Sequence, residues 1–301
     1  MPRELVFVHG RAQEGLPPLE EKHKWIGYLE EGLAKSGLEL PIGETSIHFP
    51  YYGNTLVQLV AGRDPKDVAK VLVRGIEGDE GAQVFLEAFV AELQQKVQLT
   101  PAEIEAATHA SDEAVLVERG LQNAGFVLAI LRALDAHAPW ASSAAISLAT
   151  NDVYQYLHND NISGPIDEGV VAAVTPGAET VVVAHSLGTI IAYRLLRDRG
   201  ESSGWKIPHF ITVGSPLGIG TIKSALGRIK WPAVVGSWSN AYDTHDVVAL
   251  RSLEPEWFDV QPPIKNLAVE NDTENKHGIS GYLRDPDVAK WIHAALVEGD
   301  A

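Results

Sequence analysis

A serine at the end of an apolar strand is the residue of this chain best suited to chemistry. Residues 181–184 are three valines and an alanine, and Ser186 follows after one histidine, at the start of a helical pattern over residues 187–193. A strand–serine–helix turn holds the hydroxyl on a sharp bend above the edge of a sheet, where it can act as a nucleophile. The bend needs little bulk two positions to either side, and Ala184 and Gly188 meet that need. The alternative is a serine that only caps the helix.

A serine nucleophile at neutral pH needs a general base within hydrogen-bond reach and a third group that orients the base. Two aspartates, Asp243 and Asp246, come just after a predicted strand at residues 234–240 and can supply the third group. We expect Asp246 to be this acid, because the two valines that follow it would anchor the turn and point the carboxylate inward. Asp243 stands where it could stabilise the turn through its own backbone. Otherwise, both aspartates are turn residues.

Two histidines follow these aspartates in the chain, in different surroundings. His293 falls within a predicted amphipathic helix at residues 288–296. His277 lies in a polar loop between that helix and a predicted strand at residues 266–269, and a loop side chain can reach over the sheet edge. We therefore predict that His277 is the general base; otherwise it is a surface histidine that binds water. We expect His185 to pack and not to transfer protons, because neighbouring side chains on a sharp turn diverge.

The tetrahedral intermediate of acyl transfer needs donors for its oxyanion, and each backbone N–H group in place contributes about 3 kcal/mol. The N–H of Leu187 opens the helix after Ser186, where the helix dipole adds positive potential, and is one predicted donor. We expect the second at the end of the first strand, where Gly10 lets the backbone turn toward the nucleophile and Arg11 presents its N–H. Such a site requires no metal ion and no cofactor.

The elements that must position these residues follow the pattern of an α/β fold. Apolar runs bounded by turn residues alternate with segments of helical period in the first and last thirds of the chain. This alternation is typical of a mainly parallel central sheet flanked by crossover helices. The predicted strands cover residues 5–8, 46–49, 180–184, 210–213, 234–240 and 266–269.

The middle third of the chain departs from this alternation and is expected to be helical. One apolar face recurs over residues 85–97, and residues 100–103 have capping-box spacing with proline at the first helical position. A further helix is predicted at about residues 113–136, and its part at 124–131 is apolar nearly all round, so it must be covered on several sides or face an apolar cavity. We therefore predict a core domain of residues 1–53 and 151–301 and a helical cap insertion at residues 54–150.

The composition narrows the classes of function. The chain of 301 residues has no cysteine, which excludes disulfides, thiolate metal sites and a cysteine nucleophile. Its formal charge of −16 disfavours binding to nucleic acid or to an anionic membrane surface, so neutral substrates fit better. We find no apolar stretch of about 18 residues that would span a membrane and no signal-peptide pattern. We expect a soluble, cytoplasmic protein.

Taken together, these motifs resemble those of the α/β-hydrolase superfamily, in particular its serine lipase and carboxylesterase branch. The resemblance covers roughly two-thirds of the chain, and the segment at residues 54–150 lies ahead of the serine, which is not the commonest place for a cap. The residues that carry it are His9 with Gly10, residues 184–188, residues 213–218, and residues 242–247 ahead of His277.

The resemblance implies an enzyme that hydrolyses small carboxylic esters. The aromatic and aliphatic side chains of the insertion favour an apolar acyl pocket roofed by the cap helices. His277 would act as the base for acylation of Ser186, and water would then release the acid with the same histidine. Two alternatives stay open. One is a serine thioesterase or peptidase, since the same triad cleaves thioesters and amides. The other is a non-catalytic protein of this fold that binds a small ligand.

Overall fold

A six-stranded parallel sheet forms the centre of the protein. The computed structural model describes residues 3–10, 17–53, 80–109, 122–137 and 143–297. Every strand pairs in parallel with its neighbours, in the order β2-β1-β3-β4-β5-β6. The predicted α/β class and mainly parallel sheet are therefore confirmed. The strands are β1 (Glu4–Val8), β2 (Ile47–His48), β3 (Thr180–His185), β4 (Ile207–Val213), β5 (Val235–Tyr242) and β6 (Lys265–Ala268).

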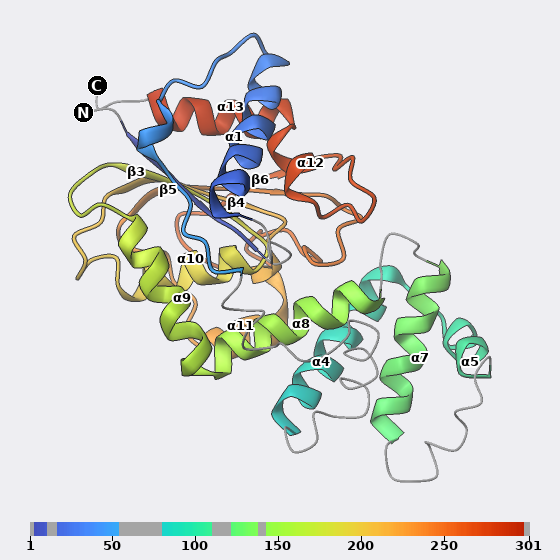
Figure 1. Cartoon of the computed structure of the whole chain (residues 1–301). Coiled ribbons are helices and arrows are strands. Elements are labelled where there is room, and N and C mark those ends of the chain that lie inside the picture. The colour runs from blue at the N-terminus through green and yellow to red at the C-terminus, as the bar shows by residue number, and fades with distance from the viewer. Residues whose placement is uncertain (1–2, 11–16, 54–79, 110–121, 138–142, 298–301) are drawn as a thin grey trace.

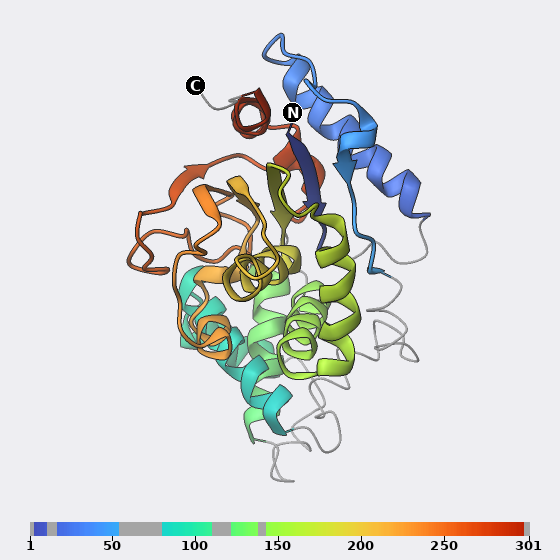
Figure 2. The same ribbon diagram turned by 90° about the vertical axis from the view of Figure 1, so that its left-hand side faces the viewer.

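Helices cover both faces of the sheet, which explains why its central strands are apolar on both sides. Alternate side chains of β3 enter two apolar clusters: Val181 and Val183 pack in one, Val182 and Ala184 in the other. Figures 1 and 2 show the two layers of helices on either side of the sheet. One layer consists of α1 (Pro18–Ala34), α12 (Ile279–Leu283) and α13 (Pro286–Val297), and the other includes α9 (Asp160–Ala173), α10 (Leu187–Asp198) and α11 (Gly220–Leu226).

All the regular elements described between β2 and β3 are helices, as the sequence predicts for residues 54–150. In the predicted capping box, Glu103 accepts a hydrogen bond from the Thr100 N–H at 2.7 Å, and the Thr100 hydroxyl accepts one from the Glu103 N–H at 3.3 Å. The apolar part of the third helix is buried at Val127, Ala129 and Ile130, in the same cluster as α10. The helices here are α4 (Glu80–Val97), α5 (Pro101–His109), α7 (Gln122–His137) and α8 (Ser143–His158).

The domain boundaries stay a prediction. Residues 54–79 and 113–121, which the predicted insertion includes, lie outside the described residues. Helix α8 runs without interruption across residue 150, where the predicted insertion ends. The same apolar cluster continues from the sheet into α4 and α7, so these helices pack on the core side that carries α10.

The direction of the strand order changes between β1 and β3. From β1 the chain goes to β2 on one side and later returns to β3 on the other. Segments that leave two such neighbouring strands diverge, and ligands of open parallel sheets bind in the gap between them. Gly10 follows the end of β1 and Ser186 follows the end of β3. The topology therefore places the predicted nucleophile where ligands of such sheets bind.

Candidate active site

Ser186 occupies the sharp turn between β3 and α10. Its backbone has a φ of 54° and a ψ of −129°, in the left-handed half of conformational space that costs a non-glycine residue on the order of 1–3 kcal/mol. The N–H and the hydroxyl of Thr189 both donate to the Ser186 carbonyl, at 2.9 and 2.7 Å. The Ser186 N–H donates to the Val213 carbonyl of β4 at 3.3 Å. These bonds hold the strained turn in place.

The three predicted triad residues lie together. His277 Nε2 is 2.9 Å from Ser186 Oγ, and His277 Nδ1 is 2.7 Å from Asp246 Oδ2. A carboxylate only accepts, so Nδ1 carries the proton and Nε2 is free to accept the serine proton. The side chain of His277 is 15% exposed, while that of Asp246 is fully buried. The imidazole therefore stands between the buried carboxylate of Asp246 and Ser186, which is itself buried.

The carboxylate of Asp246 is stabilised by several donors. Oδ1 accepts from the N–H groups of Val248 and Ala249 at 2.8 and 3.1 Å, and Oδ2 accepts from the Tyr282 hydroxyl at 2.7 Å. Burial alone would raise the pKa of Asp246, but His277 and these hydrogen bonds hold the pKa below its usual value. Asp246 is therefore ionised at neutral pH despite its burial.

Asp243, the other candidate acid, stabilises the loop instead. Its Oδ1 accepts from the His245 N–H and its Oδ2 from the Asn271 N–H, both at 2.7 Å. The Asn271 amide in turn donates to the Gly278 carbonyl at 2.9 Å, next to His277. Asp243 thus connects two loops: the acid loop, residues 243–264 after β5, and the histidine loop, residues 269–278 after β6. Asp246 is the aspartate that contacts the imidazole.

Two residues that sequence reasoning did not assign to the triad contact its members. Tyr282 of α12 is buried, and burial and Asp246 raise its pKa, so its hydroxyl stays protonated and donates. His185 Nε2 donates to the backbone carbonyl of His277 at 2.8 Å. Burial lowers the pKa of His185 to about 3, so the ring is neutral and positions the base without exchanging protons. The only rule that could have pointed to Tyr282 from the sequence is that a buried tyrosine hydroxyl needs a hydrogen-bond partner.

The end of β1 lies against Ser186, the predicted nucleophile. A Cβ on Gly10 would be 2.7 Å from the Ser186 Cβ and 3.2 Å from its Oγ, so only glycine fits. The preceding His9 is buried, and its Nε2 accepts from the Tyr52 N–H at 3.1 Å. Its Nδ1 therefore carries the proton and donates to the Gly10 carbonyl at 2.6 Å, and burial lowers the pKa of His9 to about 4.

Of the two predicted oxyanion donors, one is described. Leu187 is the first residue of α10, and an N–H in the first turn of a helix has no acceptor within the helix. It directly follows Ser186. Arg11 lies outside the described residues.

No protein-family model, curated protein or solved structure matches this chain. The site therefore rests on its own geometry. Among the described residues, no cluster of three or more histidine, aspartate or glutamate side chains could hold a metal ion. Within the same part of the chain, no helix has the length and apolar character needed to cross a membrane.

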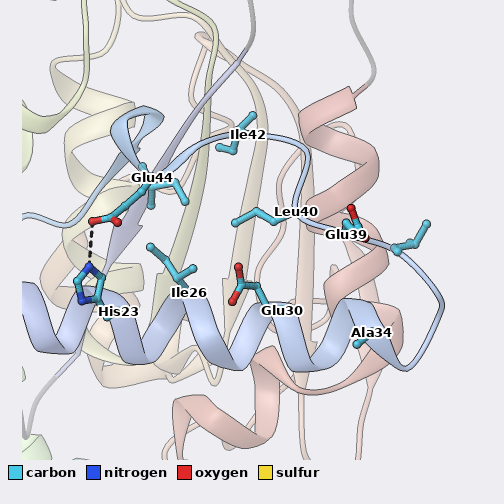
Figure 3. Close-up of a pocket in the computed structure, with 10 residues that line it drawn as sticks. His23, Ile26, Glu30, Ala34, Glu39, Leu40, Ile42 and Glu44 are labelled. Atoms are coloured by element: carbon cyan, nitrogen blue, oxygen red, sulfur yellow. Dashed lines mark hydrogen bonds and ion pairs between the residues drawn. The ribbon is translucent and has the colours of Figure 1, made fainter.

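Two cavities in the described part of the chain differ in their position relative to the triad. One of about 400 Å³ adjoins the triad, because Asp246 itself forms part of its wall, and we call it the Lys96 cavity after the lysine of α4 that lines it. The other, of about 630 Å³, is a groove between α1 and the segment that follows it, where Glu30 and Glu44 face Ile26 and Leu40 (Figure 3). No triad residue lines that groove, and Asp246 is the one triad residue that lines the Lys96 cavity.

Proposed function

We propose that this protein is a serine hydrolase that cleaves carboxylic esters through an acyl-enzyme intermediate. The observation that carries the proposal is the continuous hydrogen-bonded chain from Ser186 Oγ through His277 to the buried Asp246. The chain order serine, acid, histidine on a parallel sheet supports an enzyme of the α/β-hydrolase type. The helices α4, α5, α7 and α8 would then form its cap.

The geometry accounts for each step of such a reaction. His277 Nε2 takes the proton of Ser186 Oγ as the oxygen bonds to the ester carbonyl carbon. Asp246 stabilises the imidazolium that forms, and the Leu187 N–H donates to the oxyanion at the start of α10. His277 then gives the proton to the leaving alcohol, and the C–O bond of the ester breaks. Water repeats the sequence on the acyl-Ser186 ester with the same histidine, which releases the acid and restores the serine.

The substrate we propose is a small ester with an apolar acyl part. The walls of the Lys96 cavity include Val97 and Leu99 from α4 and its end, and Val247 and Leu250 from the acid loop. Polar and charged side chains line the rest of this cavity, and its volume is in the range of small-molecule sites. A cytoplasmic location stays a prediction, based on the absence of cysteine.

Labelling with a fluorophosphonate probe tests the proposal. Wild-type protein is expected to label, and Ser186→Ala to lose both labelling and ester turnover. Ser202→Ala, which removes an exposed hydroxyl from a surface turn, is the control and is expected to label as the wild type does. Undiminished labelling of Ser186→Ala would refute the assignment, and no labelling of any variant would favour a binding protein. A panel of matched esters, thioesters and peptides then identifies the bond that is cleaved.

A further inference from the structure

Residues 213–218, which start at the end of β4, lie beside the triad although none of the triad residues belongs to them. Gly214 has a φ of 56°, and a Cβ on it would be 3.2 Å from both Asp246 Oδ2 and His277 Cε1. The next residue, Ser215, is buried and caps the short helix that follows it. The segment therefore brings a buried hydroxyl close to the site.

Two buried hydroxyls connect this segment to the turn of the nucleophile. Ser215 Oγ is 2.9 Å from Thr189 Oγ1, and Thr189 Oγ1 is 2.7 Å from the Ser186 carbonyl oxygen. A carbonyl only accepts, so the Thr189 hydroxyl donates its proton to Ser186 and accepts from the Ser215 hydroxyl. Ser215 Oγ in turn accepts from the Leu217 N–H at 3.3 Å. Three hydrogen bonds thus run in one direction, from Leu217 to Ser186.

The Ser186 carbonyl belongs to the same peptide group as the Leu187 N–H, the predicted oxyanion donor. A trans peptide group is planar, so its C=O and N–H point in opposite directions and turn together. Hydroxyls that fix the carbonyl therefore also fix the direction of the Leu187 N–H. Hydrogen bonds in a chain polarise one another, so donation to this carbonyl makes the N–H of the same group a stronger donor.

The strained backbone of Ser186 gives this support a purpose. A non-glycine residue with a φ of 54° keeps that conformation only where the surrounding structure determines it. The Thr189 N–H donates to the Ser186 carbonyl at 2.9 Å, but it belongs to the helix that the turn begins. Ser215 follows a different strand, β4, so the hydroxyl chain connects the turn to a second element of the fold.

We propose that Thr189 and Ser215 are positioning residues that direct the Leu187 N–H at the oxyanion of the tetrahedral intermediate. Thr189 acts through the peptide group of Ser186, and Ser215 acts through the hydroxyl of Thr189. The inference rests on the proposed function and assigns residues 213–218 a part in it.

Substitutions at Thr189 test the inference with para-nitrophenyl butyrate as the substrate. Thr189→Val removes the hydroxyl and keeps the shape of the side chain. We expect kcat to fall about tenfold with little change in KM, because a misdirected donor loses part of the roughly 100-fold effect of a complete oxyanion donor. Thr189→Ser keeps the hydroxyl, and its kcat is expected to stay within about threefold of wild type.

Ser215→Ala tests the outer part of the chain and leaves the Thr189 hydroxyl in place. We expect kcat to fall about threefold, because the Thr189 hydroxyl then lacks the donor that polarises it. In the Thr189→Val background the same substitution is expected to have no further effect, because Ser215 acts through the hydroxyl that is already missing. Ser215→Ala also tests the inference if Thr189→Val does not fold.

An alkyl trifluoromethyl ketone distinguishes oxyanion binding from folding. Ser186 Oγ bonds to its carbonyl carbon, the π electrons of the carbonyl move to its oxygen, and the serine proton moves to His277, which leaves a bound oxyanion. We expect its inhibition constant to rise about tenfold in Thr189→Val, in step with the loss of kcat, and to recover in Thr189→Ser. The alcohol obtained by reduction of this ketone forms no oxyanion, so its inhibition constant is expected to be equal in all variants.

The control is Thr180→Val, the same substitution at a buried threonine at the opposite end of β3. We expect this variant to keep the wild-type kcat and the wild-type inhibition constant of the ketone. A loss in Thr180→Val as large as that in Thr189→Val would overturn the inference.

The outcomes separate this inference from the proposed function. If wild-type protein hydrolyses the ester, but Thr189→Val and Ser215→Ala keep its kcat and its affinity for the ketone, the inference is wrong and the proposed function stands. Equal losses of affinity for the ketone and the alcohol in Thr189→Val would show a purely structural role and would also overturn the inference. If wild-type protein neither hydrolyses esters nor reacts with a fluorophosphonate, both fail.

Discussion

Asp246 accepts two hydrogen bonds at each carboxylate oxygen, and Tyr282 shares Oδ2 with His277. The phenol therefore competes with the imidazole for the same oxygen. By donating to this anion, Tyr282 holds the carboxylate in one orientation and withdraws part of its negative charge from His277. We expect Tyr282 to be a positioning residue for Asp246, with which its hydroxyl forms a hydrogen bond.

The variant Tyr282→Phe tests this role. We expect kcat to fall about tenfold, as loss of a hydrogen bond to a charged group predicts, with little change in KM. The acidic limb of the pH profile of kcat/KM is expected to move to higher pH, because Asp246 then presents more negative charge to the imidazole. Tyr28→Phe on α1, whose ring stacks on Arg284, is the control. An unchanged pH profile together with lower stability would show that Tyr282 is only structural.

Gly10 is a second residue at which a small change is expected to disturb the site, because an added methyl group would contact Ser186. In Gly10→Ala the added carbon would overlap Ser186, so either the nucleophile or the end of β1 must move. We expect kcat/KM to fall by about 100-fold, the effect of a displacement near 1 Å in a reacting group.

The matched control for Gly10→Ala is Gly27→Ala. Gly27 lies within α1 and a Cβ there would meet no atom within 4 Å. We expect this variant to gain about 0.5–1 kcal/mol in free energy of unfolding from its higher helix propensity, with unchanged kcat/KM. Wild-type activity in Gly10→Ala would contradict the close approach of β1 to the serine.

At the scale of elements, three segments that follow parallel strands bring the triad together. Ser186 follows β3, Asp246 lies in the loop after β5, and His277 lies in the loop after β6. Parallel strands end at one edge of the sheet, so all three segments start from the same edge. Asn271 then connects two of them through hydrogen bonds to Asp243 and to the Gly278 carbonyl.

Helix α4 is connected to the sheet layer through Glu92. Its carboxylate accepts from the N–H groups of Gly220 and Thr221 at 3.0 Å each, in the first turn of α11. We expect Glu92→Ala to lower the free energy of unfolding by about 1–2 kcal/mol, the usual effect of removing a helix cap. Urea unfolding measures it, with Gln95→Ala on the exposed side of α4 as the control. Equal losses in both variants would show that the contact has no specific effect.

At the scale of the whole molecule, buried histidines make stability depend on pH. The pKa of His9 is about 4 and that of His185 about 3 in the folded protein, against an ordinary value of 6.5. Between 6.5 and these lowered values, the unfolded chain takes up protons that the folded chain does not. Stability from both histidines is therefore complete above pH 6.5 and is lost as the pH falls, by about 1.4 kcal/mol per pH unit for each.

Urea unfolding at several pH values between 7.5 and 4.5 tests this dependence. From pH 6.5 to 5.0 we expect the free energy of unfolding to fall by about 3 kcal/mol from the two residues together, because the unfolded histidines are only half protonated at pH 6.5. His185→Gln keeps an N–H donor for the His277 carbonyl but cannot take up a proton, so about half of this slope is expected to disappear. A wild-type stability that is flat over this range would contradict the burial of neutral histidines.

The sequence by itself determined the local features of this protein. The alternation of apolar runs and helices predicted a parallel sheet, and small residues around Ser186 predicted the sharp turn. Asp246 and His277 could be selected because loops after parallel strands meet at one edge, and the structure brings both to Ser186. These features depend on residue types within a few positions of each other and on rules of topology.

Only the tertiary structure decided which distant side chains surround the triad. Nothing near Tyr282 in the chain indicates that its hydroxyl donates to Asp246, and nothing near Lys96 indicates that it shares a cavity with the same aspartate. The contact of Gly10 with Ser186 likewise depends on how β1 pairs with β3. Such contacts depend on how helices pack on a sheet, and packing joins residues whose separation in the sequence carries no signal of their proximity.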